Sequence, residues 1–217
     1  MKKRYLFAFL GAFSNFCTAT ESASIVNLVE DDLVQYVNPL MGTDSKFSLS
    51  NGNTYPAIAT PWAMNFWTPM TSKMGDGWTY KYNENKIRGI KQTHQPSPWL
   101  NDYAAFSLMA VTGEMKFEEE QRASWFSHKA EQSGPDYYSV YLADYDVTAE
   151  VTPTERAAQF RFTFPQRDAA HIILDAFNKG SMVKILPEQR KIIGYVRNNH
   201  GGVPENFHNY FVAEFDK

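Results

Sequence analysis

Side chains that could grip a sugar are concentrated between residues 51 and 103. They are two indoles, one imidazole, two carboxamides and one carboxylate: Trp78, Trp99, His94, Asn53, Gln95 and Asp102. An indole can pack against the CH face of a pyranose and exclude water, while the polar groups exchange hydrogen bonds with hydroxyls. We therefore expect these residues to contact a carbohydrate.

Most of these residues also have an ordinary structural interpretation. Trp78 lies in the sequence Trp-Thr-Tyr-Lys-Tyr, whose alternation predicts a strand, and it could be a core or domain-interface residue. Asp102 could equally cap a loop, or hold Thr93 or His94 in place. A single histidine is more often structural than functional, and Asn53 follows a glycine in a setting typical of a turn. Both interpretations stay open at the level of sequence.

No pair of carboxylates suited to glycoside hydrolysis is evident. An inverting hydrolase needs two carboxyl groups about 6.5–9.5 Å apart, one protonated and one activating water. Asp76, Glu84 and Asp102 lie nearest the candidate residues, but their spacing does not place any two face to face. Asp76, in Gly-Asp-Gly, is typical of a turn in which the side chain bonds its own backbone. We assign no catalytic residue to this chain.

Metal-ligand spacing is also missing from the sequence. His128, His171, His200 and His208 are scattered along the chain. Calcium prefers about six to eight oxygen ligands from several loops, and no EF-hand-like run occurs. We therefore assign no metal ligand, and none of these four histidines receives a role as a ligand.

The elements that must position the candidate residues are predicted to be strands. Prolines interrupt any helix between residues 51 and 103, because they lack an amide donor and fix φ. Farther on, apolar residues alternate with polar ones in three segments: Phe160, Phe162 and Phe164; Val147, Ala149 and Val151; Tyr138, Val140 and Leu142. Further candidate strands are 105–111, 172–174, 191–196 and 210–215. Short alternating strands of this kind predict an all-β fold, an antiparallel β-sandwich.

The first residues are typical of a secretory signal. Lys2, Lys3 and Arg4 precede an apolar run at 5–16, and small residues follow at 17–19. We predict a signal peptide at residues 1–19, a lead-in at 20–33 and the sandwich domain at 34–217. Export to the periplasm, cell surface or extracellular space of a bacterium would follow. A buried apolar N-terminal segment and lipid attachment at Cys17 are the alternatives.

Charge and cysteine content exclude other classes. The formal net charge is −3 and no basic cluster occurs, which disfavours a nucleic-acid partner. Cys17 is the only cysteine, so no intrachain disulfide can form. The acidic run Glu118-Glu119-Glu120 is expected to form a solvated turn.

A series of short blocks resembles the opening of glycoside hydrolase family 92. These blocks are Tyr36 to Thr43, Asn53 to Ala57, Ile90 to His94, Asp102-Tyr103, Trp125 to His128, Tyr137 to Val140, and Thr152 to Arg156. They occur in order from about Tyr36 to the end of the chain.

The resemblance implies the N-terminal β-sandwich of a calcium-dependent, inverting exo-α-mannosidase. In that family an (α/α)6 barrel follows the sandwich and supplies the general acid, the general base and most calcium ligands. The resemblance covers the sandwich alone, so the chain is expected to be C-terminally incomplete and inactive by itself. Its partners would be a mannose-containing glycan, such as an N-glycan, and the barrel of the same polypeptide. A preference for α-1,2 linkages is expected.

Two other hypotheses compete with this one. A non-catalytic carbohydrate-binding β-sandwich would bind mannosides without a second domain. A purely structural domain would bind no sugar and would expose large aromatic patches.

Overall fold

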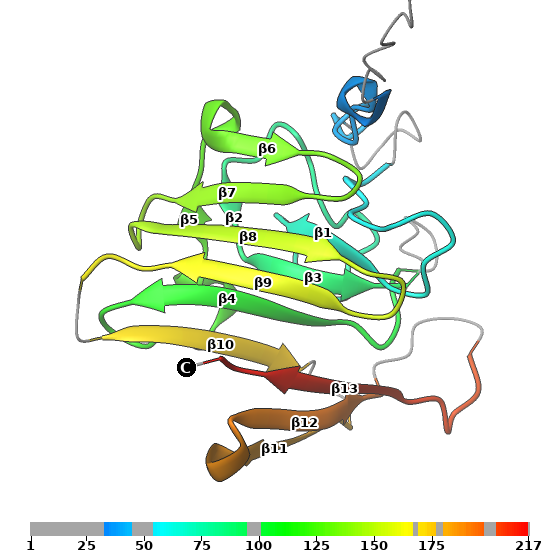
Figure 1. Cartoon of the computed structure of the whole chain (residues 1–217), viewed down its shortest axis with the longest axis vertical. Coiled ribbons are helices and arrows are strands. Elements are labelled where there is room, and N and C mark those ends of the chain that lie inside the picture. Colours follow the sequence, from blue (N-terminus) through cyan, green and yellow to red (C-terminus); the bar gives the residue numbers. More distant parts are fainter. Residues whose placement is uncertain are drawn as a thin grey trace, which may run out of the picture. The chain divides into compact units, whose positions relative to one another are not determined.

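The described part of the chain is built almost entirely from antiparallel strands (Figure 1). A computed structural model describes residues 33–44, 54–94, 101–166, 169–176, 180–197 and 203–216. The strands are β1 (Phe66–Met70), β2 (Lys86–Ile87), β3 (Gly89–Thr93), β4 (Phe106–Thr112), β5 (Ser124–Trp125), β6 (Glu131–Ser133), β7 (Tyr138–Leu142), β8 (Val147–Pro153), β9 (Ala158–Thr163), β10 (Ala170–Ala176), β11 (Met182–Leu186), β12 (Lys191–Val196) and β13 (Asn209–Glu214).

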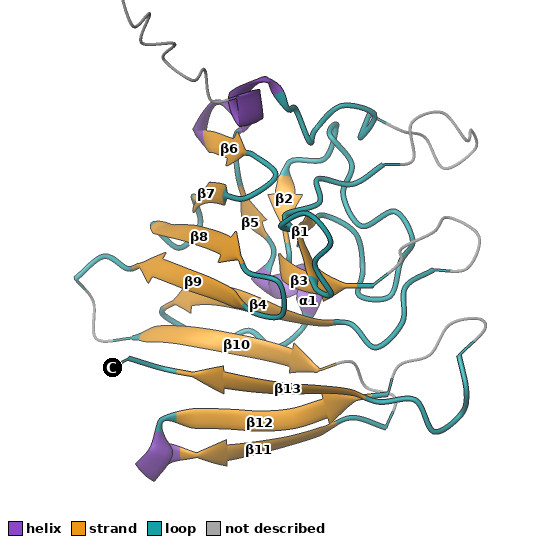
Figure 2. Ribbon diagram, turned by 45° about the vertical axis from the view of Figure 1, so that its right-hand side comes forward, coloured by secondary structure: helices purple, strands orange, loops and turns teal. Residues whose placement is uncertain are grey.

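Helical structure in these ranges is limited to single turns (Figure 2). They are α1 (Glu119–Arg122) and the 3-10 turns η1 (Leu33–Tyr36), η2 (His128–Ala130) and η3 (Pro187–Gln189). None of the helices in these ranges is both long and apolar enough to cross a membrane. The predicted signal peptide and nearly all of the lead-in lie outside the described residues, and residues Leu33–Lys217 form one compact unit.

Among the described residues the strands form four sheets in which every pairing is antiparallel. Their strand orders are β1-β3-β4-β10, β6-β7-β8-β9, β11-β12-β13 and β2-β5. Pro69 is compatible with β1 because β1 is an edge strand, where a missing amide donor removes no ladder bond. β3 pairs with β4, so the segment between Thr93 and Phe106 connects two neighbouring strands. This connection contains four of the candidate sugar-contacting residues.

One hydrophobic core joins the β1-β3-β4-β10 sheet to the β6-β7-β8-β9 sheet. Trp67 of β1 makes edge-to-face contact with Phe106 of β4 and, at 4.8 Å between ring centroids, with Phe160 of β9. Phe106 also stacks on Phe211 of β13 at 4.5 Å. Aromatic pairs of this kind stabilise a core by about 0.5–1.5 kcal/mol each beyond area burial. The predicted antiparallel sandwich is therefore confirmed.

The alternating segments form the expected strands. Val147, Ala149 and Val151 of β8 are buried, as are Tyr138, Val140 and Leu142 of β7. The phenylalanines of β9 pack against the core, while Gln159, Arg161 and Thr163 are exposed. The predicted strand at 191–196 agrees with β12 at both ends, and the other strands predicted between residues 105 and 215 agree apart from their boundaries.

One local prediction is wrong and another holds only in part. The segment following Trp78 is not a strand with one exposed face, because Trp78, Thr79 and Tyr80 are all buried. The acidic run is solvated at Glu118 and Glu120, but Glu119 is half-buried. The run enters α1, where Glu119 accepts a hydrogen bond from the Met74 amide at 2.9 Å and Glu120 pairs with Arg88 at 2.8 Å. Local charge pattern could not show these partners, which lie far away in sequence.

Candidate functional site

Asp102 organises the connection between β3 and β4. Its carboxylate accepts hydrogen bonds from the Thr93 hydroxyl at 2.8 Å, the His94 amide at 3.2 Å and the Tyr103 amide at 2.9 Å. Lys91 Nζ lies 3.0 Å from the same carboxylate. Asp102 thus contacts the chain where it leaves β3 and again just before β4. Of the two roles considered for Asp102, these contacts match the second, which is to hold Thr93 and His94 in place.

The ion pair between Lys91 and Asp102 is fully enclosed, because both side chains have no solvent exposure. Burial alone would raise the pKa of Asp102. The Lys91 ammonium, the Thr93 hydroxyl and the His94 amide outweigh that effect and hold the pKa below its usual value. Burial lowers the pKa of Lys91, against the attraction of the carboxylate. The ionised pair therefore depends on its hydrogen bonds as much as on charge.

His94 adjoins this pair, because its backbone amide donates to Asp102. Its ring stacks on Tyr103 with centroids 5.0 Å apart, and its Nδ1 is buried without a hydrogen-bond partner among the described residues. Burial lowers the pKa of His94, and the attraction of the Asp102 carboxylate offsets this only in part. The residue is half-buried, so a sugar hydroxyl could exchange a hydrogen bond only with the exposed part of the neutral ring and not with the enclosed Nδ1.

Trp78 is part of a second turn that reaches the same connection. Its side chain is buried, and its amide donates to Asp76 Oδ1 at 3.0 Å, the turn predicted for Asp76. Asn101 Oδ1 accepts from the Gly77 amide at 3.2 Å, and Gly75 O accepts from the Asp102 amide at 3.5 Å. Trp78 therefore packs beside the connection between β3 and β4, in the protein interior.

The other candidate residues cannot be placed. Asn53, Gln95 and Trp99 lie outside the described residues. Sequence reasoning missed Tyr55, whose pKa is raised to about 12 by burial and by the Asp102 carboxylate. It also missed Lys91, because a lysine inside a strand gives no sign that it will be buried. Tyr55 lies in one of the family-like blocks, which was the only signal available for it.

No metal centre is evident in the parts of the chain that the structure describes. These residues contain no group of three or more His, Cys, Asp or Glu side chains that could hold an ion. Asp102 already accepts three hydrogen bonds and forms an ion pair with Lys91. The described residues therefore do not fit a calcium ligand set.

Comparison with known proteins identifies related sequences. Residues 36–217 match the model of the glycosyl hydrolase family 92 N-terminal domain. An inverting mannosidase of that family from Bacteroides thetaiotaomicron has a structure similar to this chain, with 48% identity and a TM-score of 0.80. The similarity covers 84% of this chain and 25% of the mannosidase.

Two further relatives are more distant. An α-mannosidase from Bacteroides thetaiotaomicron, solved with mannoimidazole, is 32% identical with a TM-score of 0.69, over 85% of this chain and 25% of its own. A secreted glycosidase from Arthroderma benhamiae is 22% identical over 147 residues, which are 64% of this chain and 18% of that protein. The chain thus spans about a quarter or less of the length of these relatives.

Proposed function

Because the chain belongs to glycosyl hydrolase family 92 and matches the N-terminal domain of its members, we propose that it is the carbohydrate-contacting domain of an exo-acting α-mannosidase. The single observation that supports this role best is the position of His94. Its half-buried ring stacks on Tyr103 in the connection between β3 and β4, and its amide is held by Asp102 of the buried pair with Lys91. Two structural relatives described as mannosidases support the choice of mannose.

The proposal extends to the complete enzyme. An (α/α)6 barrel of the same polypeptide would supply both catalytic carboxyl groups, and hydrolysis would invert the anomeric centre. Calcium, where required, would be bound mainly by that barrel. We propose export from a bacterial cell and α-1,2-linked mannose in glycans such as N-glycans as the substrate. The fragment alone would be inactive.

The test begins with the coding DNA beyond Lys217, followed by expression of the complete reading frame. We expect hydrolysis of α-1,2-mannobiose with β-mannose as the first product, detected by proton NMR of the anomeric signals. His94→Ala should lower kcat/KM about tenfold, the loss expected for one hydrogen bond to a neutral hydroxyl. His171→Ala, in β10, is the matched control and should leave kcat/KM unchanged.

Other results would contradict the proposal. Absence of any mannosidase activity in the complete protein would exclude it. Millimolar affinity of residues 34–217 for methyl α-D-mannopyranoside, combined with an inactive complete protein, would favour the non-catalytic binding domain instead.

A further inference from the structure

A surface depression lies away from the Asp102 connection, between the turn at residues 82–85 and η2. Its volume is about 380 Å³, and it is lined by Tyr82, Asn83, Glu84, Asn85, Phe126, Ser127, His128 and Lys129. None of the candidate sugar-contacting residues of the first site belongs to it. Sequence reasoning gave His128 no role here.

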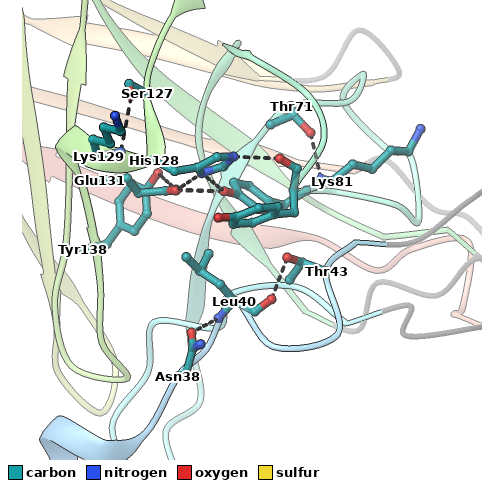
Figure 3. Close-up of polar contacts among 12 residues, drawn as sticks. Asn38, Leu40, Thr43, Thr71, Lys81, Ser127, His128, Lys129, Glu131 and Tyr138 are labelled. Atoms are coloured by element: carbon teal, nitrogen blue, oxygen red, sulfur yellow. Dashed lines mark hydrogen bonds and ion pairs between the residues drawn. The ribbon is translucent and has the colours of Figure 1, made fainter.

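The buried carboxylate of Glu131 contacts His128, one of the residues that line this depression (Figure 3). Glu131 has no solvent exposure and accepts from the Tyr138 hydroxyl at 2.7 Å and the Tyr80 hydroxyl at 2.9 Å. His128 Nδ1 lies 2.6 Å from the same carboxylate. These contacts raise the pKa of Tyr80, where burial is the largest cause and the Glu131 charge the next. Three donors from separate segments thus fix the carboxylate, and with it His128.

The other nitrogen of His128 fixes the turn. His128 Nε2 lies 2.7 Å from the Tyr82 carbonyl oxygen, so both ring nitrogens face acceptor oxygens. The Tyr82 ring stacks on this imidazole with centroids 3.9 Å apart and planes 5° apart. The Tyr82 amide donates to the Thr43 carbonyl at 3.1 Å. Tyr82 is therefore held through its amide, its carbonyl and one ring face.

Despite this fixation, Tyr82 remains 41% exposed. Because His128 stacks on one ring face, a ligand could reach only the other face or the edge of the ring. A rigid aromatic ring loses little conformational entropy when a ligand packs on it, which favours binding. Packing of the hydrophobic core does not explain why this ring is held in place, because Tyr82 is not part of that core.

The rim of the depression supplies hydrogen-bonding groups of both kinds. Asn83, Glu84, Asn85 and Lys129 are all exposed, so their amides, carboxylate and ammonium group can reach a ligand. An aromatic face beside donors and acceptors matches a pyranose, which has an apolar CH face and hydroxyls at its edge. We propose that this depression is a second contact site for a pyranose unit of a glycan, with Tyr82 as its stacking platform. The inference does not depend on the site at His94.

The test titrates methyl α-D-mannopyranoside and α-1,2-mannobiose into the 15N-labelled chain and follows amide shifts by NMR. We expect shifts at Asn83, Asn85, Ser127 and Lys129 with millimolar dissociation constants. Tyr82→Ala should weaken binding at least about tenfold. Tyr141→Ala is the matched control, because Tyr141 is a similarly exposed tyrosine, at 40%, on β7.

A second variant tests the inference even if Tyr82→Ala fails to fold. Asn83→Ala combined with Asn85→Ala alters only exposed side chains and should also weaken binding while leaving the other amide shifts unchanged. The absence of shifts around Tyr82 at about 50 mM sugar would overturn the inference. So would shifts confined to His94 and Tyr103 that His94→Ala abolishes, a result that would instead support the first site.

Discussion

The contribution of Asp102 to the stability of the fold should depend on pH in the acid range. Its pKa is held below the ordinary 3.8, so its contribution is present above that value and is lost as pH falls through the lower, folded-state value. Asp102→Asn removes the charge and leaves buried Lys91 unpaired, which should cost about 3–5 kcal/mol at pH 7. Urea unfolding between pH 2 and pH 7 should show that the free energy of unfolding falls less toward acid pH in the variant than in the parent protein.

The double variant Asp102→Asn with Lys91→Met is the control for that experiment. It removes both charges, so it should recover much of the stability that the single variant loses. A cost below about 1 kcal/mol for Asp102→Asn alone would contradict the enclosed ion pair.

The backbone of Trp62 is strained, so a substitution that relieves the strain should stabilise the protein. It has φ of 63° and is 98% exposed, in a turn closed by the bond from the Ala63 amide to the Thr60 carbonyl at 3.1 Å. A left-handed conformation costs a bulky residue about 1–2 kcal/mol, and the indole gains little packing in return. Trp62→Gly should therefore raise the free energy of unfolding by about 0.5 kcal/mol, allowing for the entropy of glycine. Thermal unfolding measures this, with Trp62→Ala as a control that retains the strain and should gain nothing.

At the scale of elements, the sequence predicted strands wherever one face is buried and the other solvated. β8 and β9 are of this kind, so their alternating residues were sufficient to predict both strands. β4 is buried on both faces, and only its general position could be predicted. β11 was missed because its apolar residues are mostly exposed and do not alternate with polar ones. The partners of α1 depend on tertiary contacts, which local pattern does not contain.

β12 depends on one glycine for its close packing. A Cβ added to Gly194 would meet the ring of Phe211 at 2.8 Å and would also crowd the Met182 carbonyl oxygen. Both neighbours are in paired strands and cannot move far. Gly194→Ala should destabilise the β11-β12-β13 sheet by about 1–3 kcal/mol through overpacking. Hydrogen exchange should show faster exchange in β12, while unchanged exchange would contradict this packing.

At the scale of the molecule, the sequence predicted the family and the sandwich but only part of the candidate site. The sequence singled out His94 and Asp102 as candidates, and the structure places both in the connection between β3 and β4. The sequence could not show that Lys91 would be buried beneath them, because burial depends on strands that come together only in the fold. Nor could it connect His128 with Tyr82, which are 46 residues apart in sequence and joined by a ring stack.

The β11-β12-β13 sheet has exposed apolar residues on the face away from Phe211. Tyr210 is 73% exposed and Val212 63%, and both line a depression of about 310 Å³ together with Met182, Ile193, Gly194 and Phe211. Burying apolar area contributes about 25 cal/mol per Å², so two such faces should associate in water. We expect the chain to self-associate at micromolar concentration in sedimentation velocity experiments. Val212→Glu should shift it toward monomer, because the charge would lose its hydration in the contact. Met115→Glu, at an exposed residue in a loop after β4, should leave association unchanged, whereas equal effects of both variants would point to general charge repulsion instead of this face.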